Sequence, residues 1–167
     1  VGHGVFAAGA KKVLVVHLLG QVFHKEHSHC PFATADALLE SYKLGKNIDA
    51  IVIDFHAEAT SEKTAMGKYL DGRVSLVVGS HTHVPTNDAR VLPKGTAYQT
   101  DAGMCGDYDS VIGFDAAGPL EKFLSKVPKF GKLEPAAGAA TLCGLIVETD
   151  DKTGLAKTCG ALQHGTL

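Results

Sequence analysis

The sequence contains no tryptophan, and aromatic residues make up only 7% of the chain. It has no apolar stretch near the roughly 20 residues that a transmembrane helix needs, so we expect no membrane partner. No basic and apolar leader precedes the first predicted strand, which gives no support for export. The formal net charge of only −2 provides no electrostatic argument for binding DNA or an anionic lipid surface.

The cysteines also lack a pattern, because none of the four belongs to a C-x-x-C pair. They are Cys30, Cys105, Cys143 and Cys159. A disulfide scaffold is unusual in a chain of 167 residues, whereas reduced thiols are the rule in the cytoplasm. We therefore predict free thiols and a cytoplasmic protein, with Cys143 as a small buried side chain in an apolar segment.

What is present is the balance of an ordinary globular protein, with 45% hydrophobic and 20% charged residues. The length fits a single domain over residues 1–167 and is enough to bury a core. The sequence contains no internal repeats, low-complexity tracts or linkers. It begins at Val1, in a segment that reads like the interior of a longer chain, so we expect the domain to be incomplete at its N-terminus.

Apolar runs and helical patterns alternate in the first half, which predicts an α/β fold. Residues 11–20, 47–55 and 73–79 have the continuous apolar character of buried strands, and 32–45 and 60–72 have the pattern of helices. The expected helix caps are Thr34 for the first helix, Thr60 or Ser61 for the second, and Gly45 and Gly72 at the two ends. Since strand–helix–strand crossovers are almost always right-handed, neighbouring strands should be parallel and adjacent.

The second half predicts antiparallel structure instead. Residues 90–100 have the pattern of a hairpin, and 101–113 form a Gly-rich loop. A short amphipathic helix is expected over 119–127, followed by strands over 141–149 and 155–163 with a turn between them. An α/β half therefore gives way to an antiparallel ending.

Histidines follow two of the predicted parallel strands. His56 comes directly after strand 47–55, and His81 and His83 come directly after strand 73–79. Because parallel neighbours end at the same edge of a sheet, we expect the three imidazoles at one edge, where α/β proteins place their sites. On extended backbone, the alternate positions of H-T-H would also point the same way. Imidazole is the commonest neutral metal ligand, so the pattern predicts a metal site.

Carboxylates flank the first of these histidines. Asp54 and Glu58 lie on either side of His56, and either could act as a ligand or accept the hydrogen bond that fixes the imidazole tautomer. The competing interpretation is that H-x-H is a pair of surface histidines without a metal. His17, inside the first predicted strand, is expected to be a hydrogen-bonded core or sheet-edge histidine.

A denser group of candidate ligands lies within seven positions: His24, His27, His29 and Cys30. It falls on a polar connection between a strand and a helix, without the second ligand-bearing segment that structural zinc sites use. We interpret it as a solvated loop, with metal binding as the alternative. The Gly-rich loop lacks P-loop spacing, and Cys105 has no adjacent base, which favours an inert thiol.

Three long motifs make the chain similar to a known family. They are DFHAEATSEK at 54–63, GSHTHV at 79–84 and GTAYQTDAGMCGDYDSVIG at 95–113. Over residues 11–160 the sequence resembles the YmdB-like metallophosphoesterases, which are calcineurin-type dinuclear phosphodiesterases. The resemblance implies a four-layer α/β/β/α sandwich and two divalent metal ions, Fe or Mn, with Zn as the alternative.

The resemblance also assigns roles to residues. The matching metal ligands are His56, His81 and His83. The residues expected to shape the substrate pocket are Cys105, Gly106 and Tyr108. The other family ligands belong to N-terminal motifs, N-G-E-N and G-N-H, and the second motif carries the histidine that protonates the leaving group. Neither motif occurs in this sequence, which therefore resembles the C-terminal two-thirds of such an enzyme.

From this resemblance we expect the intact protein to hydrolyse cyclic nucleotides, of the 2′,3′ type, or similar small phosphodiesters by means of a metal-bound hydroxide. The chain by itself is expected to be inactive, because three imidazoles cannot hold two bridged ions. Two alternatives stay open: a non-catalytic metal-binding or regulatory domain, and a degenerate family member that binds partners. The sequence also leaves open the exact substrate, the metal and whether the protein is a homo-oligomer.

Overall fold

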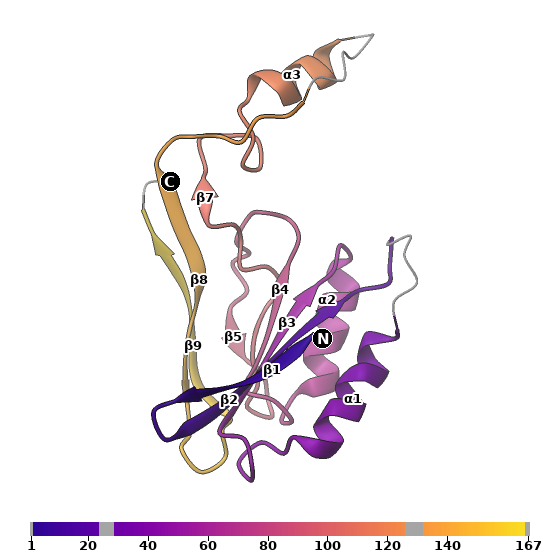
Figure 1. Ribbon diagram of the computed structural model, residues 1–167, viewed down its shortest axis with the longest axis vertical. Helices are drawn as coiled ribbons and strands as arrows, with labels where there is room; N and C mark the ends of the chain where they lie inside the picture. The colour runs from indigo at the N-terminus through magenta and orange to yellow at the C-terminus, as the bar shows by residue number, and fades with distance from the viewer. Residues whose placement is uncertain (1, 24–28, 126–131, 166–167) are drawn as a thin grey trace.

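A mixed sheet forms the centre of the molecule (Figure 1). The computed structural model describes residues 2–23, 29–125 and 132–165, and in them the sheet has six strands in the order β1-β2-β3-β4-β6-β5. The strands are His3–Ala8 (β1), Lys11–Leu19 (β2), Ala50–His56 (β3), Leu76–Ser80 (β4), Arg90–Val91 (β5) and Ala97–Gln99 (β6). Strands β2, β3, β4 and β6 are parallel, and the two edge strands are antiparallel to their neighbours.

Two helices, Pro31–Ser41 (α1) and Thr60–Leu70 (α2), cover one face of this sheet, on the right in Figure 1. Alternate residues of β3 point toward them: Ile51, Ile53 and Phe55 are at most 1% exposed and belong to the main core. Apolar side chains of both helices complete that core. Among the described residues, the helices fall short of the length and apolar character that a bilayer span requires.

A second sheet lies on the side of the main sheet opposite the helices (Figure 1). Its strands are Gly106–Asp107 (β7), Ala140–Thr149 (β8) and Ala156–His164 (β9). The turn between β8 and β9 is fixed to the main sheet by Ser75, whose hydroxyl donates to the Gly154 carbonyl at 2.6 Å. A third helix, Ala117–Leu124 (α3), lies beyond β7, away from the main sheet. The predicted α/β class and the antiparallel ending are confirmed.

The predicted N-caps and the Gly45 cap are wrong, whereas Gly72 follows the C-cap of α2 with a φ of 83°, as predicted for the end of that helix. α1 begins with Pro31 at its first position, where proline needs no N–H partner, and Cys30 is the N-cap. Thr34 therefore lies inside the helix, and its hydroxyl donates back to the Cys30 carbonyl at 3.0 Å. The N-cap of α2 is Ala59, one residue before the expected threonine. α1 also ends at Ser41, because the chain then enters a separate turn in which Gly45 has a φ of 70°.

The predicted pairing of the parallel strands is confirmed, while the first strand was not predicted. β3 and β4 are parallel neighbours, with His56 opposite Ser80 in the register. β1 forms an antiparallel hairpin with β2 through a turn at Gly9, which has a φ of 63°. In its short sequence HGVFAA, apolar and polar residues alternate too weakly to predict a strand. The strand forms because its backbone pairs with β2.

Candidate functional site

The carboxyl edge of the parallel strands brings two histidines together. His56 is the last residue of β3, and its Nδ1 lies 3.1 Å from the hydroxyl oxygen of Ser80, the last residue of β4. His81 follows immediately, and its Nδ1 lies 3.4 Å from Nε2 of His56. The two rings meet edge to face with centroids 5.3 Å apart. The parallel register alone thus places imidazoles 25 positions apart in the chain against each other.

His83 lies apart from this pair, and the expected alternation of H-T-H is wrong. The chain leaves the sheet at Ser80, and both His81 and His83 have positive φ, 155° and 64°, so the rule for extended strands no longer applies. Nδ1 of His83 lies 2.8 Å from the carbonyl oxygen of Ile112. Because a carbonyl can only accept, Nδ1 carries the hydrogen, and Nε2 of the neutral ring keeps its lone pair.

The two flanking carboxylates have different surroundings. Asp54 points to the same side of β3 as His56, but its Oδ2 lies 2.8 Å from Nδ1 of His17 on the neighbouring strand. His17 is thus a hydrogen-bonded sheet histidine, as predicted. Glu58 is exposed in the connection between β3 and α2.

Within the described parts of the chain, no three His, Cys, Asp or Glu side chains are close enough together to hold a metal ion.

Two adjacent buried charges in the first turns of α2 anchor the loops around the histidines. The Glu62 carboxylate accepts hydrogen bonds from the backbone N–H groups of Gln21 and Val22, at 2.8 and 3.2 Å. Nζ of Lys63 lies 3.1 Å from Oδ2 of Asp101. These anchoring residues were not predicted from the sequence. The only signal in the sequence was that Glu62 and Lys63 lie in the first turn of the helix that follows His56, a candidate ligand at the end of a strand.

The Gly-rich loop contacts the site through Ile112 and is held by Tyr108. The Tyr108 hydroxyl bonds the backbone of Met104 and lies 3.1 Å from the Cys143 sulfur. Burial, followed by the hydrogen bond with Cys143, raises the pKa of Tyr108 to about 12. Cys105 is exposed, with its sulfur 3.5 Å from the Cys143 carbonyl oxygen. Gly106 begins β7, so this loop joins the histidine edge to the second sheet.

We expect Tyr108 to make the free energy of unfolding decline at high pH. The folded chain favours the neutral hydroxyl, so this stabilisation is complete below the unfolded pKa of about 10 and is lost as the pH rises toward about 12. Urea unfolding at about pH 9 and about pH 11.5 should show a larger loss for the wild type than for Tyr108→Phe, which cannot ionise. Equal losses would contradict the assignment.

The dense group of candidate ligands gains no support from the structure. His24 and His27 lie outside the described residues. His29 and Cys30 are exposed at the start of α1. All four cysteines are described, and they are free thiols, with Cys143 buried as predicted.

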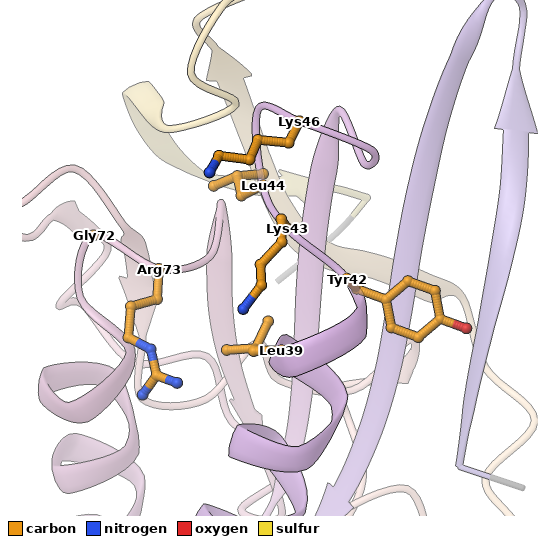
Figure 2. Close-up of a pocket in the computed structure, with 7 residues that line it drawn as sticks. All are labelled: Leu39, Tyr42, Lys43, Leu44, Lys46, Gly72 and Arg73. Carbon is orange, nitrogen blue, oxygen red and sulfur yellow. The ribbon is translucent and has the colours of Figure 1, made fainter.

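A basic cavity of about 270 Å³ lies at the opposite edge of the sheet (Figure 2). Leu39, Tyr42, Lys43, Leu44, Lys46, Gly72 and Arg73 line it. Both α1 and α2 end here, so the cations stand where helix C-termini are partly negative. Arg73 is also paired with Asp36 at 2.6 Å. The helix C-termini and the pairing with Asp36 explain these cations without a ligand. The cavity is also separate from the histidine edge.

A helix layer, a largely parallel sheet, a second sheet and histidines at the carboxyl edge together have the arrangement of an α/β metallophosphoesterase. The chain belongs to the YmdB-like protein family, whose model matches residues 1–162. The family predicted from the sequence motifs is therefore confirmed.

Two relatives of known structure and one curated relative are similar to the chain. It is 46% identical over 146 residues to a Bacillus subtilis protein named 2′,3′-cyclic-nucleotide 2′-phosphodiesterase, covering 87% of this chain and 53% of that relative. A Mycoplasma pneumoniae structure titled a novel phosphatase has a TM-score of 0.86 at 34% identity, covering 98% of this chain and 57% of that one. A structure of a hypothetical protein from Thermus thermophilus has a TM-score of 0.83 at 38% identity, covering 98% of this chain and 62% of that one. The chain spans about half the length of the curated relative.

Proposed function

We propose that the protein is a metal-dependent phosphoric diester hydrolase acting on 2′,3′-cyclic nucleotides or similar small phosphodiesters. The observation that carries this proposal is the pair of imidazoles, His56 and His81, whose nitrogens lie 3.4 Å apart at the carboxyl edge of the sheet. The name of the Bacillus subtilis relative supports the reaction and the substrate class. Because the chain spans about half of that relative, the proposal concerns the protein at full family length. The free thiols support a cytoplasmic location.

Two ring nitrogens, from His56 and His81, are placed to bind a divalent ion that accepts nitrogen ligands. His56 and His81 would hold it directly, since two ring nitrogens face each other across 3.4 Å. His83 lies apart from this pair and is the remaining candidate ligand, since the Ile112 carbonyl holds its Nδ1 in the protonated form and leaves Nε2 for an ion, as is common for metal-ligating histidines. Fe or Mn is the expected ion and Zn the alternative, with a second ion and its carboxylate ligands supplied by the rest of the full-length protein. Such ions supply Lewis-acid activation of water and neutralise charge on the phosphoryl oxygens.

The chain's own residues have separate tasks in this proposal. The hydroxyl of Ser80 at 3.1 Å orients the His56 ring. Tyr108 stays neutral at physiological pH, since its pKa is raised to about 12, and it holds the loop that carries Cys105 and Gly106 beside the site. That loop would form one wall of the substrate pocket and limit the access of bulk water.

The proposal is tested by the hydrolysis of 2′,3′-cyclic AMP and of bis-p-nitrophenyl phosphate by full-length, metal-free protein. We expect turnover to begin when Mn²⁺ or Fe²⁺ is added and to stop on chelation, with p-nitrophenyl phosphate as a monoester control that is cleaved more slowly. Full-length protein that takes up metal but hydrolyses neither diester would contradict the proposal and favour a non-catalytic metal-binding domain.

A further inference from the structure

The buried ion pair between Lys63 and Asp101 needs an explanation other than stability. Both side chains are 1% exposed, and Nζ lies 3.1 Å from Oδ2. Removing two charges from water costs about as much as their attraction returns, so apolar residues of similar shape often serve a fold equally well. A pair kept at such depth therefore points to a requirement for a particular local geometry.

Asp101 binds the H-T-H loop at its centre and just beyond it. Its Oδ2, which also meets Lys63, accepts a hydrogen bond from the backbone N–H of Thr82 at 2.9 Å. That amide lies between the two histidines of the motif. The backbone of Asp101 forms further bonds with Thr86, whose N–H donates to the Asp101 carbonyl at 3.0 Å and whose hydroxyl accepts from the Asp101 N–H at 2.9 Å.

This loop needs external support because its backbone is strained. His81 and His83 have φ values of 155° and 64°, in the region that side chains other than glycine rarely occupy. Such conformations persist only where the surrounding structure determines them, and they concentrate at functional sites. The bond from Thr82 to an ionised carboxylate is the charge-assisted type, which holds a backbone amide more firmly than a neutral acceptor does.

Lys63 connects this support to the other histidine segment. It lies in the first turn of α2, seven positions after His56, and its aliphatic stem runs beside Gly79 at the end of β4. The ion pair therefore joins the first turn of α2, the next element after His56, to the loop that carries His81 and His83.

We propose that Lys63 and Asp101 are positioning residues that set the metal affinity of the histidine site by fixing the backbone of Thr82. The inference rests on the proposed function only in taking a metal ion as the ligand of these histidines. Neither side chain is proposed to touch the ion. Removing the pair should lower the affinity even where the protein still folds, because the free loop would no longer hold His81 and His83 in their strained conformations.

The test compares full-length Lys63→Met/Asp101→Asn, which removes both charges and keeps similar shapes, with Lys63→Arg, which keeps the pair. A matched control, Asp36→Asn/Arg73→Met, removes an ion pair at the other edge of the sheet. Chelator competition should give a Zn²⁺ or Mn²⁺ affinity about 10–100-fold lower for the first variant. The affinity should stay within a few-fold of the wild type for the other two.

Two further readouts separate positioning from a merely structural role. The absorption spectrum of bound Co²⁺ should change in Lys63→Met/Asp101→Asn, because it reports ligand geometry, and a lowered melting temperature with unchanged affinity and spectrum would overturn the proposal. If that variant does not fold, Asp101→Asn alone replaces the carboxylate that accepts from the Thr82 N–H by a neutral amide, and an unchanged affinity there would equally overturn it. Suppose that the wild type hydrolyses no diester but the double variant still binds metal more weakly than the wild type. That result would uphold the positioning role and refute only the phosphodiesterase activity.

Discussion

Replacing His81 by alanine is expected to abolish metal-dependent hydrolysis and to remove metal from the full-length protein. Nδ1 of His81 faces Nε2 of His56 at 3.4 Å, so its loss leaves a single imidazole at this position. Substitution of residues that only support a ligand already costs about 10–100-fold in affinity or activity, and loss of the ligand itself should cost about 100-fold or more. Metal content per chain and the rate of 2′,3′-cyclic AMP hydrolysis measure the two effects.

The control is a triple alanine variant of His24, His27 and His29. These histidines are the densest group of candidate ligands in the sequence. The variant therefore tests whether the metal site is marked by closely spaced histidines or by histidines that two parallel strands bring together. We expect the triple variant to keep its metal and its activity. If it loses metal while His81→Ala retains it, the assignment of the site to the carboxyl edge is wrong.

Topology could be predicted from the sequence because it depends on apolar runs that are visible in the chain. Two such runs around one helix require parallel, adjacent strands, and this requirement alone places His56 and His81 at one edge of the sheet. The direction of His83 could not be derived in the same way. It depends on backbone angles after the strand ends, and these are set by hydrogen bonds from distant segments, such as the one between Asp101 and Thr82.

The buried charges next to the site show a second limit. Lys63 and Glu62 lie in a polar helix start, TSEK, that sequence patterns assign to solvent. Lys63 is nevertheless 1% exposed, because Asp101 supplies its counter-charge and Gly79 leaves room for its stem. Both conditions arise from contacts between segments that are far apart in the sequence. Residues of this kind are found by asking which buried polar groups bond the loops around a candidate ligand.

Gly79→Ala is expected to have the largest effect on stability. A Cβ at this position would lie 1.9 Å from the Thr100 carbonyl oxygen and 2.6 Å from Cδ of Lys63. The backbone cannot easily yield, because the Gly79 carbonyl accepts from the Ala102 N–H at 2.9 Å and β4 is paired with β6 on the same side. Overpacking commonly costs about 1–3 kcal/mol, and a clash with a fixed backbone should reach about 3 kcal/mol or more of unfolding free energy.

The matched control is Gly144→Ala in β8, where an added Cβ would meet nothing within 4 Å. It should leave the unfolding free energy unchanged or raise it by up to about 1 kcal/mol, because alanine restricts the unfolded chain. Urea denaturation of both variants measures the difference, and equal midpoints would show that the β4–loop contact can relax. Because Gly79 lies two residues before His81, we expect Gly79→Ala to lower metal affinity as well. The glycine that opens GSHTHV would then be required for the close approach of Thr100 and Lys63, through which the histidine edge is held in place.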